Sequence, residues 1–394
     1  MKLLKTTIWA VAACLMLQNC AKKADEKKEE TPAQEQAAGN PGAGREIWPK
    51  EQAKDWYAKQ GWLVGADFLP STAINQLEMF QAESFDTATI DKELGWAQNI
   101  GMNTMRVYLH DLLYQQDSAG FIKRLDTFLD ITKKHNIKPV LVLFDSCWDP
   151  FPKLGKQRDP KPGVHNSGWV QNPGFNALKD STQYPRLERY VKGTVAAFAN
   201  DDRVLMWDIW NEPDNTNNSS YGKVELPNKV AYVLPLMVKS FEWARSVNPS
   251  QPLSSGVWAG DWSTPQTLKP IEKAQIEQSD VITFHNYENA QEFEKRIKWL
   301  QQYDRPLICT EYMSRGNGSF FEGSLPVAKK YNVGAINWGL VDGKSQTIYP
   351  WDSWKKTYTK EPDLWFHDIF RKDGTPYKQA EVDLIKKLTS EKKS

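Results

Sequence analysis

The sequence predicts an α/β fold in which eight parallel strands, each followed by a helix, close into one (β/α)8 barrel, the TIM barrel. Short apolar runs alternate with helical patterns from Trp48 onward, and such alternation indicates a parallel sheet. Eight of these units follow one another without a second domain, which fits a closed barrel better than an open sheet. The length of 394 residues is also ordinary for a single barrel with insertions.

The expected strands are short apolar runs that end at polar or turn residues. In chain order they cover residues 61–66, 103–108, 138–144, 203–209, 252–257, 280–284, 306–310 and 333–338, of which the fifth is the weakest. The first helix after a strand is expected to begin near Asp86 and to end at Gly101, and two more are expected over residues 121–134 and 229–247.

Two connections are longer than the others, and both follow strands. They run from residue 145 to about 185, after the third strand, and from residue 340 to about 362, after the eighth. Because the loops at the carboxyl ends of barrel strands build the active site, loops of this length indicate function.

The chain begins with features of export. Lys2 and Lys5 precede a mostly apolar stretch over residues 6–17, which is typical of a signal peptide. The sequence Leu17-Gln18-Asn19-Cys20 resembles the lipobox of bacterial lipoproteins, which implies a lipid on Cys20. A plain secretory signal with a chance cysteine is the alternative.

Interpreted as a lipoprotein, the chain has three parts. Residues 1–19 are the expected lipoprotein signal peptide, residues 20–47 a flexible tether after the lipidated cysteine, and residues 48–394 the barrel. The tether has almost no apolar bulk, so burial cannot offset the entropy of ordering it. We therefore expect an exported protein, lipid-anchored to a bacterial membrane and facing the periplasm or the cell surface.

The composition excludes some classes of function. The 50 basic and 49 acidic residues nearly cancel, so no basic face for nucleic acid is expected. Besides Cys14 and Cys20, only Cys147 and Cys309 remain, which gives neither a disulfide framework nor a zinc spacing. No dinucleotide or phosphate fingerprint, metal-ligand cluster or serine nucleophile motif is present, so no cofactor or metal is expected. The 17 tryptophans favour a carbohydrate ligand modestly, because flat aromatic faces suit sugar rings.

Two glutamates stand where apolar strands end. Glu212 ends Trp207-Asp208-Ile209-Trp210-Asn211-Glu212-Pro213, and Pro213 cannot continue a strand ladder. Glu311 ends Leu307-Ile308-Cys309-Thr310-Glu311, three strands later. Retaining glycosidases need two carboxyl groups about 5–5.5 Å apart across the scissile bond. Two carboxyls on strand ends that face one barrel mouth meet that requirement.

These motifs resemble clan A of the glycoside hydrolases, the 4/7 superfamily, which includes family 5 cellulases and mannanases and the catalytic barrels of family 2. The resemblance rests on Trp-Asn-Glu-Pro after the fourth strand and Thr-Glu after the seventh. It implies a retaining β-glycoside hydrolase acting on a polysaccharide or oligosaccharide through a covalent glycosyl-enzyme. In that mechanism Glu212 is the general acid/base and Glu311 the nucleophile.

The resemblance also implies roles for residues at other strand ends. Asn211 would bond the 2-hydroxyl of the sugar, and Arg106 would hold the nucleophile ionised, since a nearby guanidinium lowers a carboxylate pKa. Tyr287, in Phe284-His285-Asn286-Tyr287, would bond the nucleophile, and His285 belongs to the same motif. Trp338 resembles the indole platform beneath the sugar that is cleaved.

The chain departs from the family pattern after the third strand. Family 5 endoglucanases commonly have a histidine there, whereas this chain has Asp145-Ser146-Cys147-Trp148-Asp149, which is more similar to mannanase-type or family 2-type barrels. The choice between family 5 and family 2 therefore stays open. His110, Trp148 and Trp258 are further candidate contacts with the sugar.

Three other readings compete with retaining hydrolysis. A non-catalytic carbohydrate-binding barrel would gain nothing from two facing carboxylates. A transglycosylase would share the glycosyl-enzyme and differ only in the acceptor. An inverting enzyme would hold its carboxyls about 6.5–9.5 Å apart, so their separation in the structure distinguishes it. The sequence leaves the sugar, the linkage and the oligomeric state open.

Overall fold

The computed structural model describes residues 44–391. The expected signal peptide at residues 1–19, the lipidation site Cys20 and most of the expected tether at 20–47 lie outside these described residues. Within them, eight parallel strands form one sheet in the order β5-β4-β3-β2-β1-β8-β7-β6. The strands are β1 Val64–Asp67, β2 Thr104–Tyr108, β3 Lys138–Asp145, β4 Met206–Asn211, β5 Leu253–Ser254, β6 Ile282–Asn286, β7 Leu307–Tyr312 and β8 Gly334–Trp338. This architecture confirms the predicted (β/α)8 barrel.

The ends of the sheet meet through a short parallel contact between the segment after β5 and β6. Val257 N donates to Thr283 O at 3.1 Å, and His285 N donates to Val257 O at 3.0 Å. The fifth strand was expected over residues 252–257 but is regular only at Leu253–Ser254. Gly256 and its serine neighbours supply no apolar bulk to this edge, which explains why the ladder there is reduced to a single bridge.

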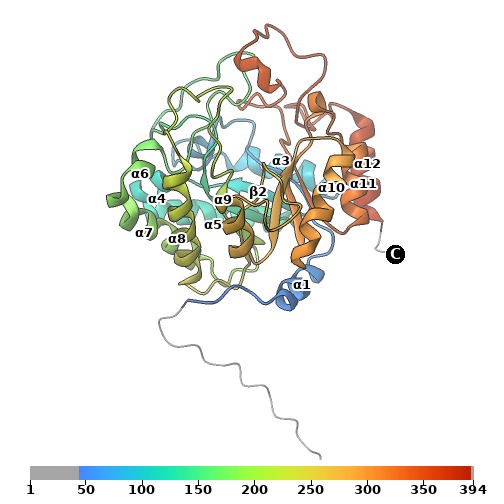
Figure 1. The fold of residues 1–394 in the computed structure, drawn as a ribbon. Helices are drawn as coiled ribbons and strands as arrows, with labels where there is room; N and C mark the ends of the chain where they lie inside the picture. The colour runs from blue at the N-terminus through green and yellow to red at the C-terminus, as the bar shows by residue number, and fades with distance from the viewer. Residues whose placement is uncertain (1–43, 392–394) are drawn as a thin grey trace, which may run out of the picture. The chain divides into compact units, whose positions relative to one another are not determined.

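Helices surround the strands, and α10, α11 and α12 pack side by side on one flank (Figure 1). The α-helices are α1 Lys50–Ala58, α2 Gln76–Phe80, α3 Thr87–Asn99, α4 Asp111–Gln116, α5 Ser118–Lys134, α6 Phe175–Lys179, α7 Tyr184–Ala197, α8 Val230–Arg245, α9 Pro270–Gln278, α10 Ala290–Leu300, α11 Phe321–Lys330 and α12 Gln379–Ser390. Four 3-10 turns are η1 Ser181–Gln183, η2 Gln301–Tyr303, η3 Arg315–Asn317 and η4 Trp351–Trp354.

Local sequence sets where the first barrel helix begins and ends. Asp86 caps α3 by accepting a hydrogen bond from Thr89 N at 3.0 Å, as expected for an aspartate before a helical pattern. Gly101 follows the helix with φ of 84°, a backbone conformation that glycine adopts freely. The predicted helix boundaries near Asp86 and Gly101 are therefore confirmed.

Helix α1 was not predicted, because it precedes the first strand and belongs to no βα unit. Its Ala53 and Tyr57 are buried together with Trp48 against the apolar ends of the strands, including Val140 and Ile336. This cluster fills the amino-terminal end of the barrel, and Figure 1 shows α1 at that end. Nearer the carboxyl ends of the strands, the side chains that face into the barrel are polar instead. This is the end at which a barrel holds its active site.

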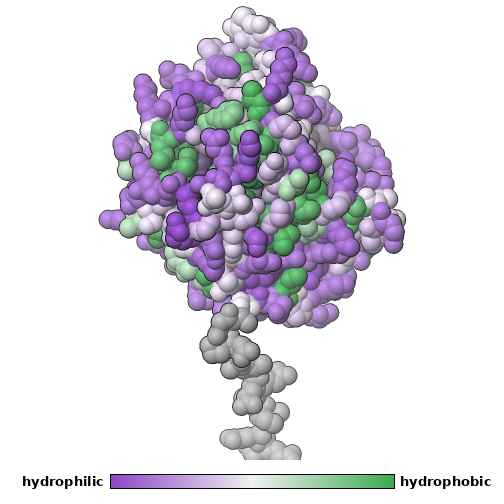
Figure 2. All heavy atoms as spheres, turned by 60° about the vertical axis from the view of Figure 1, so that its left-hand side comes forward, coloured by the Kyte–Doolittle hydropathy of each residue, from purple (hydrophilic) through white to green (hydrophobic). Residues whose placement is uncertain are grey.

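The face seen in Figure 2 is mostly hydrophilic, with hydrophobic side chains in small groups. Among the described residues, the large apolar side chains that are exposed are Phe151, Leu154, Val224 and Leu364. Such scattered residues are normal on protein surfaces. Over residues 44–391, no helix combines the length and apolarity that crossing a membrane would require.

Candidate active site

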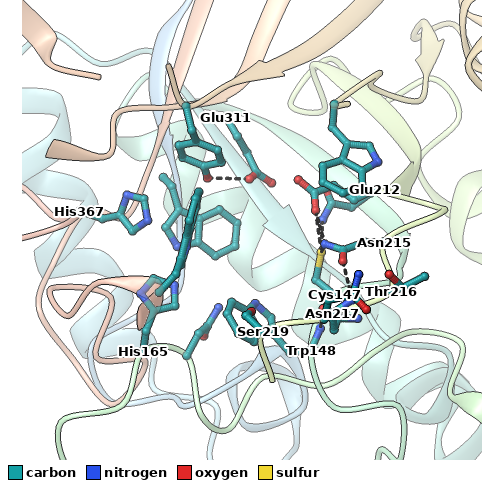
Figure 3. A pocket seen from close by; sticks show the side chains of 17 residues that line it. Cys147, Trp148, His165, Glu212, Asn215, Thr216, Asn217, Ser219, Glu311 and His367 are labelled. Atoms are coloured by element: carbon teal, nitrogen blue, oxygen red, sulfur yellow. Dashed lines mark hydrogen bonds between the residues drawn. The ribbon is translucent and has the colours of Figure 1, made fainter. Parts of the chain in front are cut away.

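A cavity of about 390 Å³ opens at the carboxyl ends of the strands, where a barrel holds its active site. Figure 3 shows Glu311 on one side of this cavity and Glu212 across from it. Most of the residues expected at the site line the cavity, namely Trp148, Asn211, Glu212, Trp258, Tyr287, Glu311 and Trp338. These side chains come from the ends of six strands, β3 to β8, and from the loops that follow them.

Glu311 lies on β7 and is surrounded by hydrogen-bond donors. Its Oε1 accepts from Arg106 Nη1 at 2.8 Å and from Tyr108 OH at 2.9 Å, and its Oε2 accepts from Tyr287 OH at 2.7 Å. Burial raises the pKa of Glu311, but His285, Arg106 and the two tyrosine hydroxyls together outweigh burial and hold this pKa below its usual value. The carboxylate is therefore held in the ionised form that a nucleophile needs.

Arg106 is fully buried on β2 and connects Glu311 to two other carboxylates. Its Nη1 lies 3.0 Å from Asp67 Oδ1, and its Nε and Nη2 lie 3.0 and 2.9 Å from Asp208 Oδ2. Its Nη2 also donates to Asn211 Oδ1 at 2.7 Å. A guanidinium with all these partners cannot change orientation, so it fixes the position of Glu311.

Glu212 follows β4 directly and has a backbone φ of 41°. Residues other than glycine rarely adopt this left-handed region, and holding one there costs about 1–3 kcal/mol. Its Oε1 lies 2.9 Å from His285 Nδ1, and its Oε2 accepts from Asn215 Nδ2 at 2.6 Å and from Cys147 Sγ at 3.2 Å. The strained turn and these three partners aim the carboxyl group at Glu311.

Glu212, His285 and Glu311 each offer an atom that lies within 4.8 Å of the atoms offered by the other two. Such a cluster is small enough to hold a metal ion. The guanidinium of Arg106 already lies 2.8 Å from Glu311, however, and a second cation at this carboxylate would be repelled by it. The donors around the cluster therefore suit an ionised Glu311 beside a second carboxyl group better than a bound metal ion.

Three further predicted residues have well-defined partners at the cavity. Asn211 Nδ2 donates to Asp145 Oδ1 at 2.9 Å, so the orientation of its amide is fixed. Trp338 packs edge to face on Tyr108, with ring centroids 5.9 Å apart. Trp258 Nε1 donates to Asp214 Oδ1 at 2.6 Å, which holds the indole at the rim.

His110 lies outside the cavity, and its contacts are structural. It caps α4, where its Nδ1 accepts from Leu112 N at 3.2 Å, and its Nε2 lies 3.1 Å from Gln171 O. It is fully buried. Its position after a strand resembled that of a ligand contact, but one ring nitrogen caps α4 and the other binds the loop after β3.

Several residues at the site were not predicted from the sequence. Tyr108 could have been found from strand alternation, because residues two apart on β2 face the same way as Arg106. Cys147 and Asn215 carry no such signal, since they lie in loops whose course only tertiary contacts fix. The same holds for His367, which reaches the cavity from the long loop after β8.

Tyr287→Phe should move the acid limb of the pH profile of kcat/KM to higher pH. The variant loses a donor to ionised Glu311, so the pKa of Glu311 rises and the carboxylate is protonated at a higher pH than in the wild type. A hydrogen bond to a charged group contributes about 1.5–3 kcal/mol, which corresponds to a shift of about one to two pH units. The profile is measured with one substrate on both proteins.

Tyr312→Phe provides the matched control. Tyr312 is also buried on β7, but its hydroxyl has no hydrogen-bond partner. The acid limb of the pH profile of kcat/KM for Tyr312→Phe should therefore coincide with that of the wild type. An unchanged limb in Tyr287→Phe, or an equal shift in both variants, would contradict the effect of Tyr287 on Glu311.

The comparisons with known proteins agree with this geometry. The sequence profile described as cellulase (glycosyl hydrolase family 5) matches residues 73–356. No curated protein matches the chain.

Among solved structures, the chain is similar to a family 5 subfamily 18 enzyme from Streptomyces cattleya in complex with Manβ1-4GlcNAc. The identity is 13%, the match covers 83% of this chain and 80% of that one, and the TM-score is 0.54. It is similar to an endo-β-1,4-mannanase from Thermotoga petrophila at 14% identity, with 85% and 77% covered and a TM-score of 0.53. It is also similar to an exo-β-1,4-mannosidase from Opitutaceae bacterium strain TAV5 at 17% identity, with 83% and 59% covered and a TM-score of 0.55.

Proposed function

Because the chain belongs to glycosyl hydrolase family 5 and is thus a glycosidase that hydrolyses O-glycosyl compounds, we propose that it cleaves β-glycosidic bonds with retention of configuration. Family membership also decides between families 5 and 2, which the sequence left open, and argues against a barrel that only binds carbohydrate.

The separation of the two carboxyl groups carries this proposal. One oxygen of Glu212 and one of Glu311 lie within 4.8 Å of each other. Retaining enzymes hold these groups about 5–5.5 Å apart, whereas inverting enzymes need about 6.5–9.5 Å to admit a water molecule between them and the sugar. The observed spacing supports attack by a carboxylate rather than by water.

The proposed reaction assigns one role to each glutamate. Glu311, held ionised by Arg106 and Tyr287, attacks the anomeric carbon, while Glu212 gives its proton to the leaving oxygen. Glu212 then takes a proton from water, whose oxygen replaces Glu311 at the anomeric carbon. Two inversions give net retention. A sugar hydroxyl in place of water would give transglycosylation from the same intermediate.

Aryl β-D-glycosides test this proposal, with the β-mannoside first because mannanases and a mannosidase are among the similar structures. A panel of mannoside, glucoside, xyloside and galactoside is followed by nitrophenol release, and the first sugar released is examined by NMR. We expect turnover of one member with the β-anomer as initial product. An α-anomer as initial product would contradict retention.

We further propose that the protein is anchored to a bacterial membrane through a lipid on Cys20. The residues that carry this proposal, Leu17-Gln18-Asn19-Cys20, precede those that the structure describes. The native protein should fractionate with membranes, and Cys20→Ser should be found in the soluble fraction with its activity intact. A Cys20→Ser protein that still fractionates with membranes would contradict the lipid anchor.

A further inference from the structure

Two long loops meet over one side of the cavity. They are the loop after β3, residues 146–174, and the loop after β8, residues 339–378. Trp148 of the first loop stacks on Trp354 of the second, with ring centroids 5.7 Å apart and an angle of 18° between the planes. The contact is continued by hydrogen bonds from His165 Nδ1 to Tyr349 O (2.7 Å), Asn166 N to Ser345 O (2.8 Å), His165 N to Ser353 Oγ (2.9 Å), Trp354 Nε1 to His165 O (2.9 Å) and Gln346 Nε2 to Lys161 O (2.7 Å).

We call residues 161–168 and 344–354 together the β3–β8 wall. In the sheet, β2 and β1 lie between β3 and β8, so loops that join across this gap close the barrel mouth above β1 and β2. The segment after β1 supports the wall as well. Asn75 Nδ2 donates to Gly168 O at 2.9 Å, and Lys344 N donates to Ser71 O at 3.0 Å. Three segments distant in sequence thus hold the wall in place.

The part of the wall around His165 lies on the side of the cavity away from Glu212, the expected proton donor. Figure 3 shows Glu212 and Asn215 on one side, and His165 and His367 on the opposite side. A general acid protonates the oxygen that leaves with the aglycone, so the aglycone lies on the side of Glu212. The sugar that is attacked, and whatever is linked to its non-reducing side, must therefore extend toward the wall.

The cavity on this side is lined by buried polar groups without partners. Both side-chain amide atoms of Asn166 lack a hydrogen bond, although the residue is fully buried. His367 lacks a partner at Nε2, while its Nδ1 lies 2.6 Å from Met313 O. Because a carbonyl only accepts, Nδ1 carries the proton and Nε2 is an acceptor. Burial also holds the pKa of His367 well below its usual value, so the ring is neutral.

Buried polar groups are nearly always hydrogen-bonded, so an unpartnered pair that lines a cavity indicates a ligand. The amide of Asn166 can both donate and accept, and Nε2 of His367 can accept from a hydroxyl. Sugar hydroxyls supply both kinds of partner. These groups sit where a longer glycone would have to continue, so they suit the free hydroxyls of a terminal sugar.

We infer that the enzyme removes single sugars from the non-reducing ends of β-linked chains, with the β3–β8 wall closing the glycone side and Asn166 and His367 binding the terminal sugar. This inference rests on the retaining reaction proposed for Glu212 and Glu311. Hydrolysis breaks the bond between the anomeric carbon and the bridging oxygen. The oxygen of water joins the anomeric carbon of the released sugar, and the remaining chain keeps the bridging oxygen as a hydroxyl.

Hydrolysis of hexasaccharides in ¹⁸O-water tests the inference, because only the glycone product gains the label. The β-1,4-linked mannose, glucose and xylose hexaoses are each digested, and early products are weighed by mass spectrometry. We expect labelled monosaccharide and unlabelled pentasaccharide. Labelled di-, tri- or tetrasaccharide would show internal cleavage, and labelled pentasaccharide would show attack from the other end. Either result overturns the inference but leaves the retaining reaction in place. Absence of hydrolysis with all three hexasaccharides overturns both the inference and the proposed reaction.

Opening the wall should admit longer glycones. Trp354→Ala removes the stack on Trp148 and the bond to His165 O, so labelled disaccharide and trisaccharide should appear beside the monosaccharide. Trp56→Ala is the matched control, because this half-buried indole lies on α1 at the other end of the barrel. An unchanged product pattern in a folded Trp354→Ala protein would show that the wall does not limit the glycone.

Asn166→Gly separates sugar binding from a structural role. Asn166 has φ of 50°, which glycine tolerates, so the substitution removes the amide without straining the loop. A lost neutral hydrogen bond lowers kcat/KM by up to about tenfold. With the wild type, aryl glycosides that lack the 3-, 4- or 6-hydroxyl should be cleaved with a kcat/KM lowered by this factor. With Asn166→Gly, one of these analogues should be cleaved as well as the full sugar, because the hydroxyl it lacks is the one that Asn166 binds. Equal losses on both proteins for every analogue would overturn the role of Asn166.

Discussion

Glu311→Ala should lose turnover by a factor on the order of 10⁵ to 10⁶, as expected when a covalent nucleophile is removed. The donors that surround Glu311 explain why no other group replaces it. Arg106, Tyr108 and Tyr287 all donate to its two oxygens. The other two carboxylates near Arg106, Asp67 and Asp208, are buried within the barrel. Nitrophenol release from the aryl glycoside that the wild type cleaves best measures the loss.

The variant also leaves a space the size of a carboxyl group beside the anomeric carbon. Azide that enters it should restore part of the turnover and give the α-glycosyl azide, since only one inversion then occurs. Glu288→Ala is the matched control, because Glu288 is exposed next to Tyr287 and its ion pair with Arg296 lies at the surface. This control should keep activity within about a factor of two. Near-normal activity of Glu311→Ala would contradict the assignment of Glu311 as the nucleophile.

Glu212→Ala should show a loss that depends on the leaving group. For natural linkages, where the leaving oxygen needs a proton, general acid catalysis contributes a factor of about 10² to 10⁴, and this factor should be lost. For a dinitrophenyl glycoside, whose leaving group needs no proton, formation of the glycosyl-enzyme should continue at close to the wild-type rate. Burst kinetics and steady-state rates on a series of aryl leaving groups measure this difference.

Azide gives a second diagnosis for Glu212→Ala. It should accelerate breakdown of the glycosyl-enzyme without base assistance and give the β-glycosyl azide, because two inversions occur. The two variants are therefore expected to yield azides of opposite configuration. An equal loss on activated and natural substrates would contradict the assignment of Glu212 as the acid/base.

Sequence patterns were sufficient for the residues at strand ends. Glu212 and Glu311 each follow an apolar run, and parallel strands end at one face, so their proximity followed from the fold. The same argument placed His110 among the candidate contacts, although its nitrogens cap α4 and bind the loop after β3. A strand-end histidine looks the same in sequence whether it faces the cavity or caps a helix, and only its partners at Leu112 and Gln171 distinguish the two.

The residues of the β3–β8 wall could not be placed from sequence. No periodicity positions a loop, and the position of Asn166 depends on a backbone hydrogen bond to Ser345, which lies in the distant loop after β8. His367 depends in the same way on Met313. The weak fifth strand and the unpredicted α1 have a related cause, because each is stabilised by neighbours distant in sequence rather than by its own pattern.

A wall on the glycone side also orders the events after each bond is cut. The freed sugar lies between the wall and the rest of the chain, so it must leave by the same mouth through which the chain entered. The shortened chain has to dissociate before the site can empty and refill. If the enzyme removes terminal sugars as proposed, we expect degradation to be distributive, with one encounter for every sugar removed. Shorter chains should then accumulate evenly across a population rather than one chain being consumed at a time.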